Sequence, residues 1–449
     1  MRSNLWLDHL WMPFTSHNEM LDYPPLVIER GSGIYLYGDD GKQYIDAIGS
    51  WWVSAFGHCN PQINDAVKKQ LDKLEHVLMA GFISDTTAEL TSLLGEVLPP
   101  QLKRIFYSDN GSTSVEVALK IALQYHAVRG DDERSEFVAL GGGYHGDTLG
   151  AVSVGGIPSF HTLFQERFKK AHFTDSPYCF RCPSGKDPQN CSAECMDSLH
   201  NVLNEHGSRI AGCIFEPMVQ GAIGMRIYPP KVLHRIFALC KKHKIITIAD
   251  EVAVGFGRTG EMFACDHAGL VPDIMCLAKC LTGGYLPLAV TAVKEEIYDE
   301  FKGGPFSNRT LNHGHTFTGN PLASAAAVAT LKLLIQDKYP KSAESVMQYF
   351  AKGLSSLDNH KNISGVRHLG FAGAFEIVKN KETKEPFPKE TQVPFKISQI
   401  ALQKGLIIRP LGNTVYYMPP FNIKIEELDQ IFSLTKETIE EVFNEHTSS

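Results

Sequence analysis

The chain has 449 residues, 43% of them hydrophobic and 21% charged, so it is long and apolar enough to bury a large core. A net charge of -7 and a pI near 6.2 argue against a nucleic-acid-binding protein. No apolar run approaches the roughly 20 residues of a membrane span, and residues 1–8 lack the continuous apolar stretch of a secretory signal. We therefore expect a cytoplasmic protein without nucleic-acid or membrane partners.

Secondary-structure signals change twice along the chain. Residues 33–46 have the pattern of a β-hairpin with its turn at Asp40-Gly41. From about residue 61 to 321, strand-like and helix-like segments alternate, which predicts a mainly parallel sheet covered by helices on both faces. After residue 321, a long helix near 322–335 and a strand near 405–409 indicate a smaller α/β region.

A candidate anion site follows the strand-like residues 104–108. The turn 109–113 contains Gly111 and Ser112 and leads into an amphipathic helix over 114–123. Free backbone N–H groups at the start of a helix, together with a serine hydroxyl, suit a phosphate dianion. Taken alone, such residues before a helix are usually only a cap.

A glycine-rich segment, 141–147, follows the strand-like residues 137–140. It places Tyr144 where its ring could stack on a planar ligand. His145 is the more tempting catalytic residue, but we interpret it as structural or as part of the cleft wall.

Two acids end the apolar, β-branched run 245–249, which is typical of a buried parallel strand. Ligands bind at the carboxyl ends of strands in open α/β sheets. Asp250 could therefore pair with the ring nitrogen of a bound pyridine, although an acid in this position could equally be a helix cap or a surface charge.

Lys279 follows another strand-like run, 273–278, and precedes a glycine-broken loop. A desolvated lysine amine has a lowered pKa and becomes nucleophilic. The commoner alternative is a lysine that reaches solvent at a strand end. An amine, an acid and a phosphate site are together the three requirements of pyridoxal 5′-phosphate chemistry, which favours the functional interpretation.

A different class of enzyme is indicated by Gly255, Gly257 and Gly260, which match the dinucleotide fingerprint G-x-G-x-x-G. That motif should turn directly from a strand into a helix. Here residues 250–254 intervene and little helix follows, so a nicotinamide oxidoreductase is disfavoured.

Four cysteines, Cys179, Cys182, Cys191 and Cys195, lie within one Pro- and Gly-rich insertion. Such a cluster could hold zinc. Its second pair is spaced more widely than in a usual zinc knuckle, and the insertion lies outside the other motifs. A reduced surface loop is therefore the default interpretation, and we assign no metal.

The order of these motifs, with 255–260 after the acid pair and 314–321 after the lysine, resembles the class III aminotransferases of fold type I over nearly the whole chain. The resemblance implies an α/β fold with a large domain, residues 61–321, built on a mainly parallel seven-stranded sheet. It also implies a smaller α/β domain built from both termini, residues 1–60 and 322–449.

The resemblance further implies the roles of the cofactor-site residues. Lys279 would bind the aldehyde of pyridoxal 5′-phosphate covalently, and Asp250 would pair with its ring nitrogen. Tyr144 would stack on the ring, with Glu216 nearby. The phosphate would be bound by Gly111 and Ser112 of one subunit and Thr316 of the other, which requires a homodimer.

Within this class, Trp51-Trp52 and residues 144–148, 216–221 and 409–412 resemble the subfamily that aminates 8-amino-7-oxononanoate in biotin synthesis. In that subfamily Arg409 would hold the substrate carboxylate by paired hydrogen bonds, and Asp147 and Arg258 would form an ion pair at the edge of the pocket. The implied substrate-pocket residues are Phe14, Trp51, Trp52, Asp147, Arg258, Gly314, His315, Arg409 and Tyr416.

Two positions leave the amino donor open. Some members have tyrosine in place of Phe14, and members vary at His315. We expect S-adenosylmethionine as donor, with lysine as the alternative. The cofactor motifs would also serve another ω-aminotransferase, acting on 4-aminobutyrate, ornithine, a diamine or an amine with pyruvate, or an aminomutase. The tryptophan pair and Arg409 favour a long apolar substrate that ends in a carboxylate.

Overall fold

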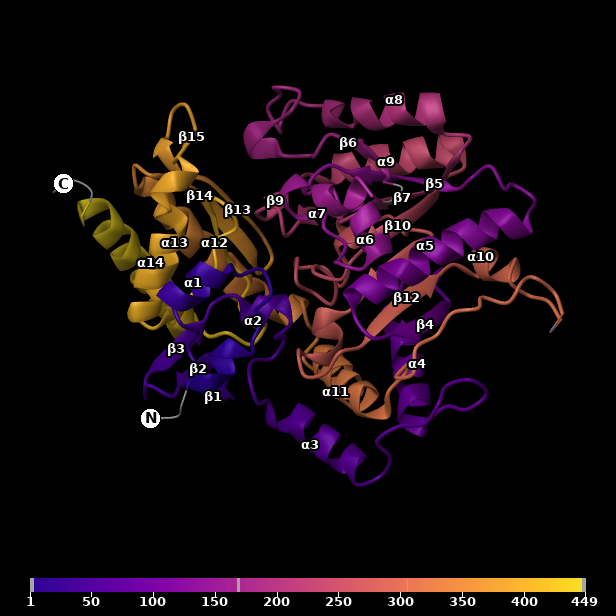
Figure 1. Cartoon of the computed structure of the whole chain (residues 1–449), viewed down its shortest axis with the longest axis horizontal. Coiled ribbons are helices and arrows are strands. Elements are labelled where there is room, and N and C mark those ends of the chain that lie inside the picture. Colours follow the sequence, from indigo (N-terminus) through magenta and orange to yellow (C-terminus); the bar gives the residue numbers. More distant parts are fainter. Residues whose placement is uncertain (1–3, 168–169, 305, 446–449) are drawn as a thin grey trace.

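The fold was analysed in a computed structural model that describes residues 4–167, 170–304 and 306–445. The outermost residues of the predicted domain division, 1–3 and 446–449, lie outside the described residues. Figure 1 shows the N-terminal and C-terminal segments lying together, beside a larger body that is built around one sheet.

The larger body contains a seven-stranded sheet. Its strands, in spatial order, are β4 (Arg104–Ser108), β12 (Ala289–Val293), β11 (Ile274–Leu277), β10 (Ile246–Asp250), β7 (Ile210–Phe215), β5 (Glu136–Leu140) and β6 (His172–Thr174). The edge strand β4 and the strands from β11 to β6 run in one direction, and β12 pairs antiparallel with both of its neighbours. The predicted mainly parallel, seven-stranded sheet is confirmed.

Helices cover both faces of this sheet because its central strands are apolar on both sides. Ile246 and Ile248 of β10 pack with the apolar face of α5 (Gly111–Val128), whereas Ala249 packs with residues of α8 (Asp197–His206) and α9 (Pro230–His243). Each fully buried isoleucine stabilises the fold by about 1.5–3 kcal/mol. The sheet is therefore a rigid base for groups placed at its strand ends.

Two smaller sheets form what we call the terminal region. One contains β1 (Ile28–Ser32), β2 (Tyr35–Gly38), β3 (Gln43–Asp46) and β16 (Leu406–Ile407); the other contains β13 (Ile363–Leu369), β14 (Ala372–Asn380), β15 (Glu385–Pro386) and β17 (Thr414–Tyr417). The predicted hairpin is confirmed by antiparallel pairing of β2 with β3. Parallel pairing of β3 with β16 joins the two ends of the chain in one sheet.

Further helices complete the two bodies. They are α1 (His17–Asp22), α2 (Gly49–Trp52), α3 (Pro61–Leu71), α4 (Asp85–Val97), α6 (Leu149–Ser153), α7 (Pro158–Gln165), α10 (Glu295–Asp299), α11 (Pro321–Gln336), α12 (Glu344–Ser356), α13 (Val393–Gln403) and α14 (Ile425–Glu445). The predicted helix near 322–335 corresponds to α11, which packs against α3 and α4. The division of the chain at residue 321 stays a prediction. None of the helices in the described part is both long and apolar enough to span a bilayer.

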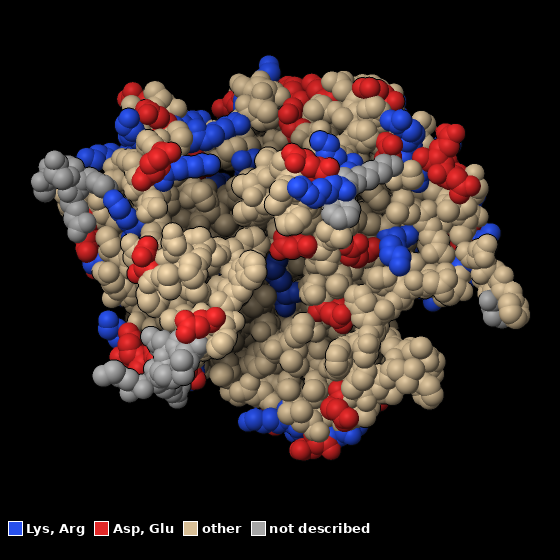
Figure 2. All heavy atoms as spheres, viewed as in Figure 1, with Lys and Arg blue, Asp and Glu red and all other residues tan. Residues whose placement is uncertain are grey.

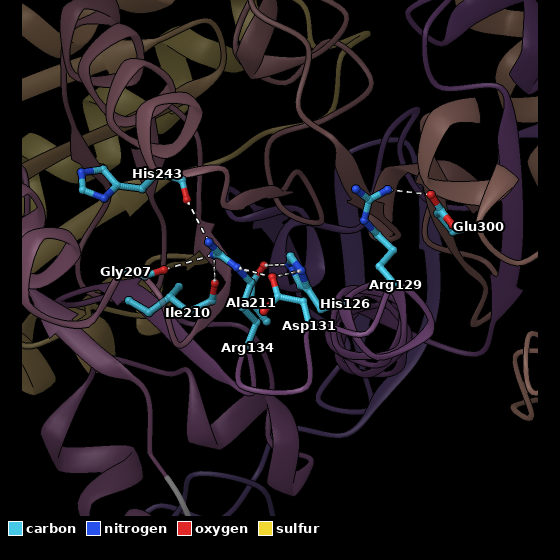
Figure 3. A network of polar contacts seen from close by, with 9 residues as sticks. All are labelled: His126, Arg129, Asp131, Arg134, Gly207, Ile210, Ala211, His243 and Glu300. Atoms are coloured by element: carbon cyan, nitrogen blue, oxygen red, sulfur yellow. Dashed lines mark hydrogen bonds and ion pairs between the residues drawn. The ribbon is translucent and has the colours of Figure 1, made fainter.

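Arg134 fastens several chain segments at one end of the sheet (Figure 3). Its guanidinium donates to the carbonyl oxygens of Gly207 (3.1 Å), Ile210 (2.8 Å) and His243 (3.3 Å) and pairs with Asp131. Two of these carbonyls belong to the ends of α8 and α9, where a cation also interacts favourably with the helix dipoles. Arg134 is thus a structural cation, remote from the site described next.

Candidate active site

A cavity of about 1190 Å³ lies where the carboxyl ends of the large-sheet strands meet the terminal region. Figure 2 shows the surface hollowed between these two parts of the molecule. Eleven of the predicted site residues line the cavity: Phe14, Trp51, Trp52, Gly111, Ser112, Tyr144, Asp147, Glu216, Asp250, Lys279 and Arg409. Segments far apart in the sequence therefore meet in one site.

Asp250 is the last residue of β10, and both of its carboxylate oxygens are held. Oδ2 lies 2.7 Å from His145 Nδ1, and Oδ1 accepts the backbone N–H of Val252 at 3.1 Å. His145 is buried, and its Nε2 has no partner among the described residues. His145 was expected to be structural or part of the wall; the structure shows that it lines the cavity and also holds the candidate acid.

Lys279 lies just after β11 and is the first residue of a short 3₁₀ helix. Its backbone φ of 43° is in the left-handed region, which is uncommon for a lysine. The amine lies 4.8 Å from the centre of the Trp52 ring. Burial lowers the pKa of the amine, and this effect outweighs the opposing effect of the carboxylates of Asp250 and Glu216. The amine is therefore more readily neutral and nucleophilic than an exposed one.

Glu216 follows β7 and is 4% exposed. Its two oxygens accept the backbone N–H groups of Tyr144 (2.9 Å) and Gly221 (2.8 Å). Burial raises the pKa of this carboxyl to about 7. Glu216 thus ties the segment that carries Tyr144 to the end of a neighbouring strand.

Tyr144 is held at both ends of its side chain. Its hydroxyl donates to Asp147 at 2.7 Å, and its ring stacks on that of His161 at a centroid distance of 6.0 Å. Burial, followed by the hydrogen bond to Asp147, raises the pKa of the phenol, which therefore stays protonated. An aromatic surface is thus fixed at the cavity wall.

The start of α5 forms an anion cradle. Asn110 caps the helix by accepting the N–H of Thr113, which leaves the first backbone N–H groups, those of Gly111 and Ser112, without an intrahelical acceptor. A side chain at position 111 would place its Cβ 2.6 Å from a methyl group of Val252, so any residue but glycine would require Val252 to shift. The Ser112 hydroxyl lies 2.7 Å from the Thr148 hydroxyl. Thr148 was not predicted as a site residue, although it lies in a segment that the resemblance had singled out.

These groups suit pyridoxal 5′-phosphate. A buried amine, a carboxylate, an aromatic ring and a helix start with free N–H groups line the same cavity. They correspond to the aldehyde, the ring nitrogen, the ring face and the phosphate of that cofactor.

The opposite side of the cavity is aromatic and carries one cation. The Arg409 guanidinium lies 4.9 Å from the Trp51 ring centre and donates to the Phe14 carbonyl at 3.4 Å. The Phe14 ring is 5.7 Å from that of Trp51 and 5.4 Å from that of Phe160. Phe160 was not predicted, because it lies on α7, outside every motif.

Tyr416 lies behind this wall. It is fully buried, its ring meets that of Trp52 edge-on at 5.9 Å, and it does not line the cavity. Its hydroxyl has no hydrogen-bond partner among the described residues. A direct contact with substrate stays a prediction for Tyr416.

The predicted ion pair between Asp147 and Arg258 is wrong. Arg258 is fully buried and its guanidinium donates to the carbonyl oxygens of Pro419 and Ser54, while Asp147 accepts from Tyr144. The guanidinium also lies 4.5 Å from the Phe421 ring centre. Its Nη1 and Nη2 atoms point to these carbonyls and its Nε has no partner among the described residues, so the guanidinium does not pair with Asp147.

Residues Gly314, His315 and Thr316 do not line the cavity of their own chain. His315 Nδ1 lies 2.6 Å from Asp109 Oδ2, and Thr316 is exposed. A single chain does not test the expectation that Thr316 completes the phosphate site of a second subunit, so the roles of these three residues stay predictions.

The glycines of the dinucleotide fingerprint lie in turns. Residues 252–263 form turns and bends, and the first helical element after them is the short 3₁₀ helix Ala264–Ala268. Glu251, the acid that precedes them, is buried and accepts the N–H groups of Ala264 and Cys265. The strand-to-helix turn that a dinucleotide site needs is therefore missing.

The four clustered cysteines, at positions 179, 182, 191 and 195, line a second cavity of about 10 Å³ and are unpaired. Burial raises the pKa of the Cys179 thiol to about 11 and that of Cys195 to about 12. In the described part of the chain, no three His, Cys, Asp or Glu side chains are placed to hold a metal ion.

Comparisons with known proteins identify the family of the chain. Residues 16–439 match the family model described as aminotransferase class III. A Geobacter sulfurreducens protein named adenosylmethionine-8-amino-7-oxononanoate aminotransferase is 43% identical over 422 residues, covering 94% of this chain and 93% of the relative.

Two solved structures extend the likeness to the fold. The enzyme of the same name from Methanocaldococcus jannaschii has a TM-score of 0.92 at 37% identity, covering 98% of this chain and 99% of that one. An (S)-enantioselective ω-transaminase from Thermomicrobium roseum has a TM-score of 0.92 at 30% identity, covering 98% and 97%. The chain belongs to the class III aminotransferases, which have fold type I and depend on pyridoxal 5′-phosphate.

Proposed function

We propose that the chain transfers an amino group to 8-amino-7-oxononanoate, giving 7,8-diaminononanoate for biotin synthesis. The observation that carries this proposal is a single cavity lined by Lys279, Asp250 and Arg409, which combines cofactor chemistry with a carboxylate-binding cation beside Trp51. The names of relatives that are 35–43% identical support the substrate over those of other ω-aminotransferases.

The cofactor, when bound, supplies an aldehyde that accepts the amino group and an electron-withdrawing ring that stabilises charge at the reacting carbon. Lys279 would hold that aldehyde. Its amine would also move the proton at the reacting carbon of the substrate. The lowered pKa of Lys279 favours the neutral amine that this proton transfer needs.

Asp250 would hold the ring nitrogen in its protonated form through its carboxylate. His145 is the positioning residue for this carboxylate, because it pairs with Oδ2 from a buried position. Glu216 holds the Tyr144 backbone, so that the aromatic ring keeps its place at the cavity wall.

Arg409 binds the carboxylate at the end of the keto substrate, and the rings of Trp51, Phe14 and Phe160 exclude water from its apolar chain. A guanidinium can pair with a carboxylate through two parallel hydrogen bonds. We propose S-adenosylmethionine as the amino donor and retain lysine as the alternative.

The proposal includes a cytoplasmic homodimer with shared active sites. Four apolar side chains, those of Leu78, Phe82, Ile83 and Phe317, are 52–63% exposed. Phe317, the residue after Thr316, contacts His76 at a ring distance of 5.1 Å and so lies near the segment that carries the other three side chains. An exposed apolar patch of this kind suits a subunit interface. The ten unpaired cysteines suit a reducing compartment.

An assay of 8-amino-7-oxononanoate amination, with S-adenosylmethionine and lysine offered in separate reactions, tests substrate and donor together. We expect turnover with S-adenosylmethionine. Turnover only with pyruvate, 4-aminobutyrate or ornithine would replace the proposed substrate, and activity of a monomer in sedimentation would contradict the shared site.

A further inference from the structure

Arg367 is a cation that joins the terminal region to the large-sheet region. It lies on β13, and its guanidinium donates to the carbonyl oxygens of Met225 (2.7 Å), Gly224 (2.5 Å) and Gly365 (2.7 Å). Gly224 and Met225 belong to the turn between β8 (Val219–Gln220) and β9 (Arg226–Ile227), on the large-sheet side. The Arg367 side chain is 11% exposed.

A carboxylate holds Arg367 in place and is itself held by a second arginine. Glu376 of β14 lies 3.5 Å from the Arg367 guanidinium and accepts a hydrogen bond from Arg181 at 3.0 Å. The side chains of Arg367 and Glu376 are both largely buried. We call Arg181, Arg367 and Glu376 the Arg367 clasp. A buried guanidinium with these acceptors has little freedom to move.

The turn that Arg367 holds forms part of the catalytic cavity. Within residues 221–225, Ala222 lines the cavity and the backbone N–H of Gly221 donates to Glu216. The same turn approaches the terminal region closely, since a Cβ on Gly224 would lie 2.7 Å from the Thr414 hydroxyl.

Thr414 in turn anchors the loop that carries the carboxylate-binding cation. Thr414 and Leu411 exchange two backbone hydrogen bonds, of 2.8 and 3.0 Å. Arg409, Leu411 and Gly412 all line the cavity. The turn 221–225 and the loop 409–412 therefore meet at Thr414, and the Arg367 clasp joins their supporting strands.

We propose that Arg367, paired with Glu376, which Arg181 also contacts, is a positioning residue for the keto substrate. It touches neither substrate nor cofactor. It acts by keeping the turn 221–225 against the loop 409–412, which sets the space between Ala222 and Arg409. This inference rests on the proposed function. It adds a residue that affects keto-acid binding without contacting the reacting groups.

Arg134 offers a matched control. It is also a largely buried arginine that donates to three backbone carbonyls and pairs with an acid, but none of its partners lines the cavity (Figure 3). The experiment compares the holoenzymes of wild type, Arg367→Met, Glu376→Gln and Arg134→Met. It measures KM for 8-amino-7-oxononanoate, kcat at saturation, cofactor affinity and thermal stability.

Displacement of a substrate-binding segment by about 1 Å can cost up to about 100-fold, so we expect Arg367→Met to raise the keto-acid KM about 10-fold to 100-fold. Its kcat and cofactor affinity should stay within about threefold of wild type, because the strand ends that hold the cofactor are unchanged. Glu376→Gln keeps a hydrogen-bond acceptor and should give a smaller rise. Arg134→Met should lose stability with its KM unchanged.

The inference is overturned if Arg367→Met and Arg134→Met lose stability alike and both keep the wild-type KM. If Arg367→Met does not fold, Glu376→Gln and Arg181→Ala make the same comparison, and wild-type KM values in both would overturn it. Failure of wild type to aminate 8-amino-7-oxononanoate would instead refute the proposed function. The KM comparison would then use the keto acid that wild type does aminate.

Discussion

The two sides of the cavity are built differently. The cofactor side consists of residues at or just after the ends of large-sheet strands, such as Asp250 after the buried run of β10 and Lys279 after β11. The substrate side consists of segments near residues 14, 51 and 409, in which Phe14 is 48% and Trp51 38% exposed.

Left-handed backbone occurs on both sides of the cavity, at Lys279 on the cofactor side (φ 43°) and in a run of residues on the substrate side. Phe14, Ser50, Trp51 and Trp52 on the substrate side have φ values between 46° and 76°, in the left-handed region that few side chains favour. Backbone in such conformations persists only where the surroundings hold it. We infer that the groups at the strand ends of the large sheet determine the reaction type. The segments from the two ends of the chain determine which substrate binds. Changes on the first side should therefore lower kcat, and changes on the second should raise KM.

The largest effect is expected for Lys279→Ala. Loss of the proton-transferring amine should lower turnover by at least about 10³-fold. Lys294→Ala is a matched control, because Lys294 pairs with Asp273 near the far end of the same sheet. Steady-state assays should find that control near wild type. Full turnover by Lys279→Ala would refute the proposed mechanism, in which Lys279 binds the cofactor and transfers the proton.

Asp250→Asn should come next, with a fall in kcat of about 10²- to 10⁴-fold. The amide would not keep the ring nitrogen protonated, whereas the anion cradle proposed at Gly111 and Ser112 should still hold the phosphate. Cofactor affinity, measured by titration of the apoenzyme, should therefore change far less than kcat. Near-normal turnover would count against the assigned role.

Glu216→Gln tests the raised pKa of this buried carboxyl on the cofactor side, through the pH dependence of the free energy of unfolding. Because burial raises the pKa of Glu216 to about 7, the folded protein binds this proton more tightly than the unfolded chain does. This contribution to stability is complete below pH 4.5 and is lost as pH rises through 7. Relative to Glu216→Gln, wild type should lose about 2–3 kcal/mol of unfolding free energy between pH 5 and pH 8. Parallel pH profiles in denaturant titrations would contradict the assignment.

The smallest effect is expected on the substrate side, from Arg409→Lys. Lysine keeps the charge but loses the paired hydrogen bonds, which are together worth about 1.5–3 kcal/mol. The keto-acid KM should rise about 10-fold to 100-fold with kcat nearly unchanged. A fall in kcat without a change in KM would erase the contrast between the two sides.

The same contrast explains what the sequence could predict. Strand-end residues were predicted because an apolar, β-branched run followed by a polar residue or glycine has a recognisable pattern, as at Asp250 and Lys279. Their convergence followed from the rule that ligands bind at the carboxyl ends of parallel strands.

Tertiary contacts had no such pattern. Arg258 was expected to pair with Asp147, because a sequence does not reveal that backbone carbonyls of Ser54 and Pro419 already surround its guanidinium. Phe160 and Arg367 reach the site or its supports from elements without a motif. The proposed contribution of Thr316 would depend on a second copy of the chain, which no local pattern specifies.

The covalent bond between Lys279 and the cofactor is the central claim, and mapping it is the most direct test. Holoenzyme reduced with borohydride and digested should yield one peptide carrying the cofactor mass on the ε-nitrogen of Lys279. Attachment of that mass to any other lysine, or its absence from the reduced holoenzyme, would contradict the account.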